Sequence, residues 1–241
     1  MWKTSSYMVK STKITYNHIT ITTNNSHNNT MFIIDFDDTL FDTQRFKQAR
    51  LLEVERLGVS EEEFWITYRQ ARNSSDGLFT YSDERHAEML SRIGYDKQEV
   101  LQMLEETSVK SISEFVFPDT FLFLKKIKSF GEPMILLSLG NPGFQELKTK
   151  GIGVHTFFDR VFIVHDTKKH VLEELFLHHT SERAWFINDK VEETLDLSAQ
   201  FVQLHPLLKV AEERSIIEYK QSGLKYFSSL TDIADYVETH K

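Results

Sequence analysis

Four apolar residues followed at once by three closely spaced aspartates constrain the fold of this chain more than any other feature. Residues 31–34 predict a buried strand. Asp35, Asp37 and Asp38 come where that strand must end. A carboxylate is costly to bury without a partner, and ligands of open α/β sheets bind at the carboxyl ends of the strands. The cluster therefore indicates a cation site or a catalytic site, although an acidic turn that begins a helix at Asp38 or Thr39 would also account for it.

The chain beyond Pro118 alternates between apolar segments of strand length and longer helical segments. This alternation predicts a parallel sheet with crossover helices, and the continuously apolar strands indicate a sheet that is covered on both faces. We expect strands at 134–137, 160–164, 184–188 and 201–204, and helices at about 120–129, 143–150, 168–178, from 191 onward and at 230–237.

Residues 43 to about 109 have a helical pattern throughout. The first helix of this segment is expected to end before Gly58, because glycine favours the left-handed conformation found at helix ends. Ser60 is followed at the third position by a glutamate, which is a capping-box pattern for a second helix. Two further helices are expected at 83–93 and 96–108. An all-helical segment is thus inserted between the first and second strands of the sheet.

The composition argues against several classes of protein. The 241 residues suffice for one large α/β domain or for a core with a small second domain. A formal net charge of −8 argues against nucleic-acid binding, for which a basic surface is expected. The absence of cysteine excludes a disulfide framework, a zinc–thiolate site and a thiol nucleophile, and it fits a cytoplasmic location. No apolar run approaches the ~20 residues that span a bilayer, so no membrane partner is expected.

Residues 1–30 differ in composition from the rest of the chain. They are rich in Ser, Thr and Asn, contain no acidic residue, and lack the apolar segment of a secretory signal. We expect a polar and flexible N-terminal arm, with an added pair of strands as the alternative.

Residues 35–39 resemble the first motif of the haloacid dehalogenase-like (HAD) hydrolases, in which two aspartates are separated by one residue and a threonine follows. Three further motifs follow in the order that this family requires. Ser138 ends an apolar strand, Lys168 opens a helix, and Asp189 follows another apolar strand. Each motif is short, but the four together extend the resemblance from residue 31 to the C-terminus.

The resemblance implies a fold and a domain organisation. The expected fold is α/β, with a Rossmann-like, doubly wound parallel sheet and an inserted all-helical cap of the C1 type. Residues 31–42 and 115–241 would form the core domain, and residues 43–114 would form the cap. Cap side chains would shape the substrate pocket, and the candidates are Trp65, Tyr68, Arg69, Arg72 and His86.

The resemblance also implies a chemistry. Asp35 would be the nucleophile that forms an aspartyl-phosphate, and Asp37 would be the general acid and base. An acid at position 37 indicates the phosphatase branch, because the dehalogenases of the superfamily lack it. Lys168 would stabilise the phosphate and the nucleophile, with Lys169 as the alternative. The phosphate would also be held by the residues that end the second-motif strand, namely Ser138, Leu139 and Gly140.

Two carboxylates and a phosphate repel one another, so the same resemblance implies Mg²⁺, which prefers oxygen ligands. Its ligands would be the carboxylates of Asp35 and Asp189 and the backbone carbonyl of Asp37. Asp189 would otherwise serve as the N-cap of the next helix. The family usually has a second acid in the fourth motif; here Glu193 stands near that place and would act on the cation through water.

These implications define the expected function. The protein would be a Mg²⁺-dependent, cytoplasmic phosphatase, monomeric or homodimeric, that hydrolyses a small phosphorylated metabolite. Two alternatives remain open at this point. A phosphotransferase or mutase would use the same four motifs, and a non-catalytic HAD-like binding module would keep the fold without the reaction.

Overall fold

The computed structural model describes residues 30–178 and 183–240 of the chain. Apart from Thr30, which begins the first strand, the expected N-terminal arm lies outside the described residues.

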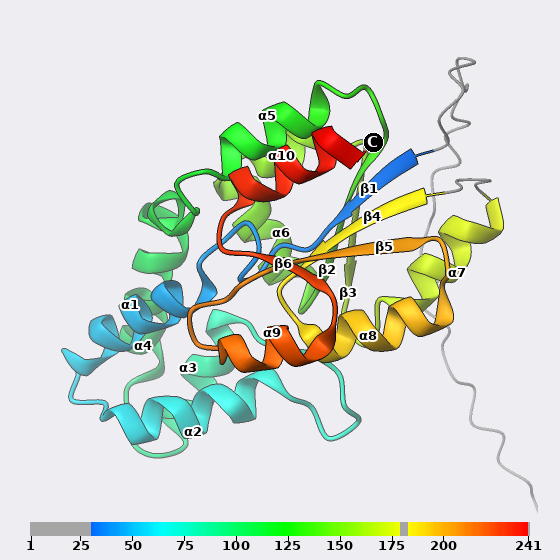
Figure 1. The fold of residues 1–241 in the computed structure, drawn as a ribbon. Helices are drawn as coiled ribbons and strands as arrows, with labels where there is room; N and C mark the ends of the chain where they lie inside the picture. Colours follow the sequence, from blue (N-terminus) through cyan, green and yellow to red (C-terminus); the bar gives the residue numbers. More distant parts are fainter. Residues whose placement is uncertain (1–29, 179–182, 241) are drawn as a thin grey trace, which may run out of the picture.

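A single six-stranded parallel sheet forms the centre of the molecule (Figure 1). Its strands lie in the order β3-β2-β1-β4-β5-β6, and every neighbouring pair is parallel. This arrangement confirms the predicted doubly wound α/β fold. The strands are β1 (Thr30–Ile34), β2 (Met134–Leu139), β3 (Arg160–Val164), β4 (Arg183–Asn188), β5 (Leu204–Lys209) and β6 (Lys225–Phe227).

Helices follow the strands in both layers, as the predicted alternation requires. Within residues 30–178 and 183–240 the α-helices are α1 (Thr43–Glu55), α2 (Glu61–Arg72), α3 (Asp83–Ser91), α4 (Lys97–Glu105), α5 (Thr120–Lys128), α6 (Pro142–Gly151), α7 (Lys169–His178), α8 (Val191–Gln200), α9 (Ile216–Ser222) and α10 (Leu230–His240). Short π- and 3₁₀-helical turns follow at η1 (Glu106–Lys110), η2 (Ile112–Phe115) and η3 (Val154–Phe157).

Side chains of β1 alternate between two hydrophobic cores, one on each face of the sheet. Phe32 and Ile34 pack in the core that includes α5 and α10. Met31 and Ile33 pack in the core that includes α7 and α8. Because both faces are covered, β1 is continuously apolar from Met31 to Ile34, as the sequence predicted.

Helices α1 to α4 form the insertion between β1 and β2, and they gather at one end of the sheet (Figure 1). They have a hydrophobic core of their own, which includes Leu51, Phe64, Leu90 and Leu104. The predicted capping box at Ser60 is confirmed at the start of α2. The helix expected at 96–108 ends earlier, at Glu105, and continues as the π-helical turn η1.

The chain crosses between the sheet and the helical insertion twice, and the two crossings are hydrogen-bonded to each other. Phe41 pairs with Val116 as an antiparallel bridge. The backbone N–H of Asp42 donates to the carbonyl of Phe115 at 2.7 Å, and the N–H of Phe117 donates to the carbonyl of Leu40.

The strand expected at 201–204 is wrong, because the chain forms β5 later. Phe201 is the C-cap of α8, and the side chain of Val202 is 86% exposed. Pro206 lies inside β5, where a proline argues against a central strand. It is accommodated because pairing with β6 begins only at Leu207. Helix α9 and strand β6 were not predicted at all.

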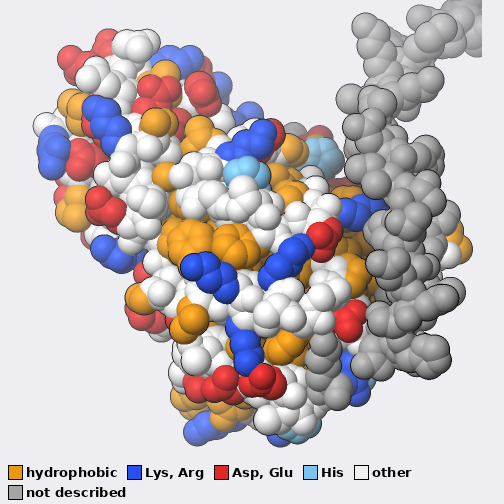
Figure 2. Space-filling model, turned by 90° about the horizontal axis from the view of Figure 1, so that it is seen from above, with side chains coloured by type: hydrophobic (Ala, Val, Ile, Leu, Met, Phe, Trp, Pro, Cys, Tyr) orange, Lys and Arg blue, Asp and Glu red, His pale blue; other side chains and the backbone are white. Residues whose placement is uncertain are grey.

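No helix in the described part of the chain is both long and apolar enough to span a membrane. Figure 2 shows the face over α5 and α10, where apolar side chains lie at the surface between charged side chains of both signs. The exposed apolar residues of α5 are Phe121 and Leu122.

Candidate active site

The two acids at the centre of the site follow neighbouring strands of the sheet. Asp35 follows β1 and Asp189 follows β4, and these strands pair through Ile34 and Ile187. The N–H of Asp35 donates to the carbonyl of Ile187 at 2.9 Å. Both acids are almost completely buried, with exposed fractions of 2% and 1%. Because the carboxyl ends of parallel strands meet at one edge, the acids of two distant motifs are brought together.

Lys168 connects Asp35 to a further carboxylate, that of Glu193. Its Nζ donates to Asp35 Oδ1 at 2.8 Å and to Glu193 Oε2 at 2.8 Å. Burial disfavours the ammonium, but the charges of Asp35 and Glu193 outweigh burial and raise the pKa of Lys168. Lys169 instead lies at the surface, with its Nζ 3.9 Å from Glu173. Of the two candidate lysines, Lys168 is therefore the one that contacts Asp35.

Glu193 is held by two donors rather than left free. Besides Lys168, the side-chain amide of Asn188 donates to Glu193 Oε2 at 3.0 Å. Burial raises the pKa of Glu193, but the charge of Lys168 outweighs burial and the pKa is lowered. Glu193 thus remains anionic and orients Lys168, while its expected contact with a cation through water stays a prediction.

The carboxylates of Asp35 and Asp189 have oxygens that no donor satisfies. Asp35 Oδ2 and both side-chain oxygens of Asp189 are buried without a hydrogen-bond partner among the described residues. Burial and the charge of Asp35 raise the pKa of Asp189 to about 8, and burial likewise raises the pKa of Asp35. Arg214 lies close to Asp189, with its Nε 3.7 Å from Oδ2. A buried carboxylate stays ionised only when it is paired or coordinates a metal, so these raised pKa values leave room for a cation.

These orphaned oxygens fit the expected divalent cation. The alternative role of Asp189 as a helix N-cap is wrong, because the N-cap of α8 is Lys190 and no side chain caps that helix. The described residues contain no group of three His, Cys, Asp or Glu side chains able to hold a metal. A cation at this edge would therefore depend on two carboxylates and a backbone carbonyl, which suits Mg²⁺ because it keeps several waters.

Asp37 is bound by three donors, none of which the sequence predicted. Its Oδ1 accepts from the hydroxyl of Thr43 at 2.8 Å and from Lys148 Nζ at 2.5 Å. Its Oδ2 accepts from the amide of Gln145. Burial raises the pKa of Asp37, but the charge of Lys148 and these hydrogen bonds lower it to about 2. Asp37 is therefore anionic in this arrangement.

Gln145 and Lys148 lie on α6, immediately after the second motif. Both are 3% exposed, and they are three positions apart, so they lie on the same buried face of the helix. Two polar side chains at this spacing are the signal that the sequence offered. This spacing alone could not predict a role for the two residues, because the sequence does not show which face of the helix is buried.

Gln145 also contacts the predicted phosphate-binding loop. Its amide donates to Ser138 Oγ at 3.1 Å and to the carbonyl of Leu139 at 3.3 Å. A Cβ atom at Gly140 would lie only 2.8 Å from Gln145 Nε2. The glycine therefore lets Gln145 close over the loop, in addition to its expected close approach to phosphate.

Asp38 adopts the left-handed backbone conformation, with φ of 58°. Aspartate is one of the few residues other than glycine that tolerate this conformation. Burial and the charge of Asp37 raise the pKa of Asp38 to about 6. The N-cap of α1 is Asp42 rather than Asp38 or Thr39, although Asp38 Oδ1 also accepts from the N–H of Thr43 at the start of that helix, at 3.1 Å.

One candidate pocket residue of the cap, His86, lies instead in the cap interior. It is completely buried, and its ring nitrogens lie 3.0 Å from Thr67 Oγ1 and 3.0 Å from Tyr81 Oη. The same Tyr81 hydroxyl accepts from Arg50, which is also buried and paired with Asp83. His86 therefore belongs to a buried polar network that joins α1, α2 and α3.

Burial, together with the charge of Arg50, lowers the pKa of His86 to about 3. Since the unfolded chain binds the proton near pH 6.5, the fold should lose stability as the pH falls from about 6.5 toward 3. The slope from this residue is at most about 1.4 kcal/mol per pH unit. We expect His86→Gln to flatten the pH dependence of the free energy of unfolding, measured by urea titration between pH 7.5 and 5. His170→Gln, at an exposed position, is the matched control; equal slopes for His86→Gln and wild type would contradict this prediction.

The other four cap candidates are not buried in this way. Arg69 is exposed, and Arg72 stacks on Phe79 at 4.3 Å. Tyr68 is half-buried beside Lys47, whose Nζ is 5.7 Å from the centre of its ring. Trp65 lines a pocket.

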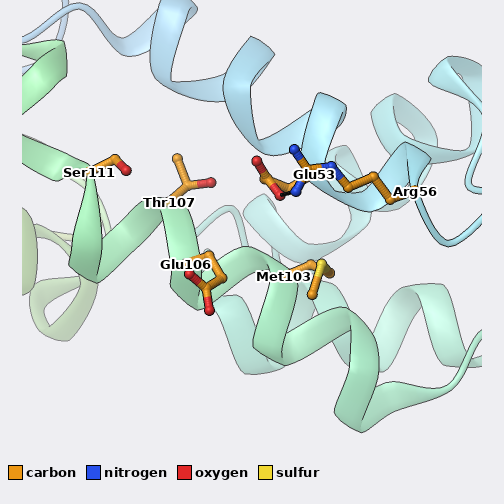
Figure 3. Close-up of a pocket in the computed structure, with 6 residues that line it drawn as sticks. All are labelled: Glu53, Arg56, Met103, Glu106, Thr107 and Ser111. Carbon is orange, nitrogen blue, oxygen red and sulfur yellow. Dashed lines mark hydrogen bonds and ion pairs between the residues drawn. The ribbon is translucent and has the colours of Figure 1, made fainter.

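This pocket of about 390 Å³ lies where α1 and α2 meet the loop after β5. Its lining residues are Asp42, Gln44, Arg45, Gln48, Trp65 and Glu212. A second pocket of about 320 Å³ lies between α1 and the α4–η1 segment (Figure 3). It is lined by Glu53, Arg56, Met103, Glu106, Thr107 and Ser111, none of which belongs to the candidate active site.

Comparison with known proteins places the fold. No protein-family model matches the sequence, and no curated protein matches it. A haloacid dehalogenase-like hydrolase of Burkholderia xenovorans LB400 aligns over 86% of this chain and 96% of its own, with 16% identity and a TM-score of 0.66. A β-phosphoglucomutase of Thermotoga maritima aligns over 87% and 98%, with 13% identity and a TM-score of 0.61. The magnesium-bound HAD-type hydrolase YfnB of Bacillus subtilis aligns over 87% and 98%, with 14% identity and a TM-score of 0.57.

These likenesses confirm the resemblance seen in the four motifs at the level of the fold. The chain has the haloacid dehalogenase-like fold, a Rossmann-like sheet with a helical insertion after the first strand. Dehalogenases and a mutase share this fold, so it does not by itself select a reaction.

Proposed function

We propose that this protein is a Mg²⁺-dependent phosphatase that hydrolyses a small phosphorylated metabolite through an aspartyl-phosphate on Asp35. The observation that carries the proposal is the position of Asp35. It is buried beside Asp189, held by Lys168 at 2.8 Å, and keeps one oxygen without a donor. A carboxylate in this environment can act as a nucleophile toward phosphorus once its charge and that of the phosphate are balanced.

Asp37 supports the phosphatase branch over the dehalogenase branch. A dehalogenation needs no proton donor for a departing halide, whereas an alkoxide leaving group needs a proton. Asp37 is an acid two residues beyond the proposed nucleophile, and its carboxylate is held in place by Thr43, Gln145 and Lys148. A bound phosphate would raise the pKa of Asp37 above its value in the empty site, because like charges disfavour ionisation.

The proposed reaction has two steps. In the first, the Asp35 carboxylate attacks phosphorus and the bond from phosphorus to the ester oxygen breaks. That oxygen takes the proton that Asp37 holds once the bound phosphate has raised its pKa. In the second, a water attacks phosphorus and gives a proton back to Asp37. The bond from phosphorus to Asp35 breaks, and inorganic phosphate is released. Lys168 balances negative charge on Asp35 and the phosphate in both steps.

The residues that would hold Mg²⁺ are Asp35, Asp189 and the backbone carbonyl of Asp37. When bound, the cation supplies positive charge that reduces the repulsion between the carboxylates and the phosphate. The likeness of this chain to a magnesium-bound hydrolase of the same fold supports this assignment.

Hydrolysis of p-nitrophenyl phosphate, measured with Mg²⁺ and with excess EDTA, tests this proposal. We expect activity only with the metal, and a rise in melting temperature on adding Mg²⁺. Asp189→Asn should abolish both effects, because it removes a carboxylate ligand. It should also raise the melting temperature in EDTA, because it removes a buried carboxyl group whose oxygens accept no hydrogen bond from the described residues. Asp196→Asn, at an exposed position on α8, is the matched control.

The outcomes separate the alternatives. A metal-induced rise in melting temperature without hydrolysis of any phosphate ester would favour a non-catalytic binding module. Loss of the phosphoryl group to an added sugar or sugar phosphate, rather than to water, would identify a phosphotransferase or mutase.

A further inference from the structure

Lys148 is a buried cation, and a gain in the stability of the fold does not explain the aromatic side chains around it. Its ammonium lies 5.1 Å from the ring centre of Phe36, 5.2 Å from that of Phe41 and 5.6 Å from that of Phe144. It is 3% exposed and forms an ion pair with Asp37. Replacing a buried ion pair by well-packed apolar residues is often neutral or stabilising. An aromatic enclosure that positions one ammonium against one carboxylate is therefore better explained by a role for that carboxylate.

Gln145 makes the same carboxylate rigid from the other side. Its amide binds Asp37 and also binds Ser138 and Leu139 at the end of β2, so one side chain ties the loop of the first motif to the loop of the second. Its own Oε1 is buried without a donor among the described residues. The amide is thus oriented toward Asp37 even though one of its own polar atoms remains unsatisfied.

The α6 helix delivers both side chains to one point. Gln145 and Lys148 are one turn apart, and they bind the two different oxygens of Asp37. Together with the hydroxyl of Thr43, they leave the Asp37 carboxylate no freedom to rotate. Catalysis by a proton-transferring group requires such a fixed geometry, because a misplacement of about 1 Å can cost a factor of about 100 in rate.

We propose that Lys148 and Gln145 are positioning residues for the proton-transfer step, acting through the carboxylate of Asp37. This inference rests on the proposed phosphatase function. Neither residue needs to touch the substrate in this role. The aromatic rings around Lys148 keep its ammonium directed at Asp37, and Gln145 fixes the distance between Asp37 and the phosphate-binding loop.

A double-mutant cycle on the full-length protein tests the proposal. Lys148→Met and Gln145→Met are each combined with Asp37→Asn, and kcat/KM is measured with Mg²⁺ on an alkyl phosphate, because its alkoxide leaving group needs the proton that Asp37 transfers. In the wild-type background each single replacement should lower kcat/KM by about 10- to 100-fold. In the Asp37→Asn background the same replacement should change kcat/KM by no more than about twofold, because the group through which it acts is gone.

Lys150→Met is the matched control, since Lys150 lies on the same helix with 59% of its side chain exposed. Melting temperatures identify any variant that fails to fold, and Gln145→Met, which removes no charge, keeps the test valid if Lys148→Met unfolds. Equal losses in both backgrounds would assign the two residues a purely structural role and overturn the proposal. No loss in the wild-type background would also overturn it. A wild-type protein that hydrolyses no ester would instead refute the phosphatase function itself, and the inference with it.

Discussion

Replacing Asp35 with asparagine is expected to abolish phosphate-ester hydrolysis, with a fall in kcat of at least about 10⁴-fold, as is common when a nucleophile is removed. The amide cannot form the acyl phosphate, and it no longer balances the charge of Lys168, which donates to Asp35 Oδ1. The decisive measurement is the mass of the protein quenched in acid during turnover. Wild type should gain the mass of one phosphoryl group, and the variant should gain none.

A matched replacement makes this result specific. Asp166→Asn lies at an exposed position before α7 and should retain wild-type kcat and the phosphorylated intermediate. Turnover in Asp35→Asn comparable to that of Asp166→Asn would exclude the covalent route and leave direct attack by water as the mechanism.

Replacing Asp37 with asparagine should slow the reaction by an amount that depends on the leaving group. General acid–base catalysis typically contributes about 10²- to 10⁴-fold. A p-nitrophenolate ion departs without a proton, whereas the alkoxide of an alkyl phosphate does not. We therefore expect the loss of kcat/KM to be at least about 10-fold larger on an alkyl phosphate than on p-nitrophenyl phosphate. Steady-state assays of both esters measure this difference.

The second step gives Asp37 an independent signature. Water attack on the aspartyl-phosphate also needs a base, so the Asp37→Asn protein should accumulate the phosphorylated form during turnover of p-nitrophenyl phosphate. Equal losses on the two esters, with no accumulation, would show that Asp37 transfers no proton in either step.

The sheet and the position of the site could be predicted because both depend on local patterns. Continuous apolar runs specify strands that are covered on both faces, and acids directly after such runs must lie at one edge of a parallel sheet. Asp35 and Asp189 follow this rule, and the structure places them at the ends of paired strands. Lys168 directly precedes α7 at the same edge, so its contact with Asp35 follows from the same geometry.

The residues around Asp37 could not be predicted because their role depends on long-range packing. Gln145 and Lys148 are ordinary helical residues in the sequence, and only the docking of α6 brings them to a carboxylate more than one hundred positions away. The prediction that His86 faces the substrate pocket was wrong for the same reason. A histidine on a helix is equally compatible with a pocket and with an interior, and its burial between Thr67 and Tyr81 depends on how three helices pack.

Strand β5 was misplaced because two local rules conflicted. Phe201 and Val202 are apolar and β-prone, whereas Pro206 argues against a strand. In the structure both rules fail. Phe201 ends α8 instead of beginning a strand, and Pro206 lies within β5, at a position where β6 does not yet pair. Strand position near a sheet edge is set by which neighbours are present, which a sequence does not state.

The paired crossings at Phe41 and Val116 restrict how the helical insertion can swing. Because the two crossing segments are hydrogen-bonded side by side, we expect them to act as a single hinge. The insertion could then rotate about this hinge but could not slide or twist on either segment alone. Asp37 lies four residues before the bridge at Phe41, and it binds Thr43, which lies two residues after Phe41. Any rotation of the insertion about this hinge would therefore begin at the Asp37 carboxylate, so the geometry of this acid and the accessibility of the site would change together.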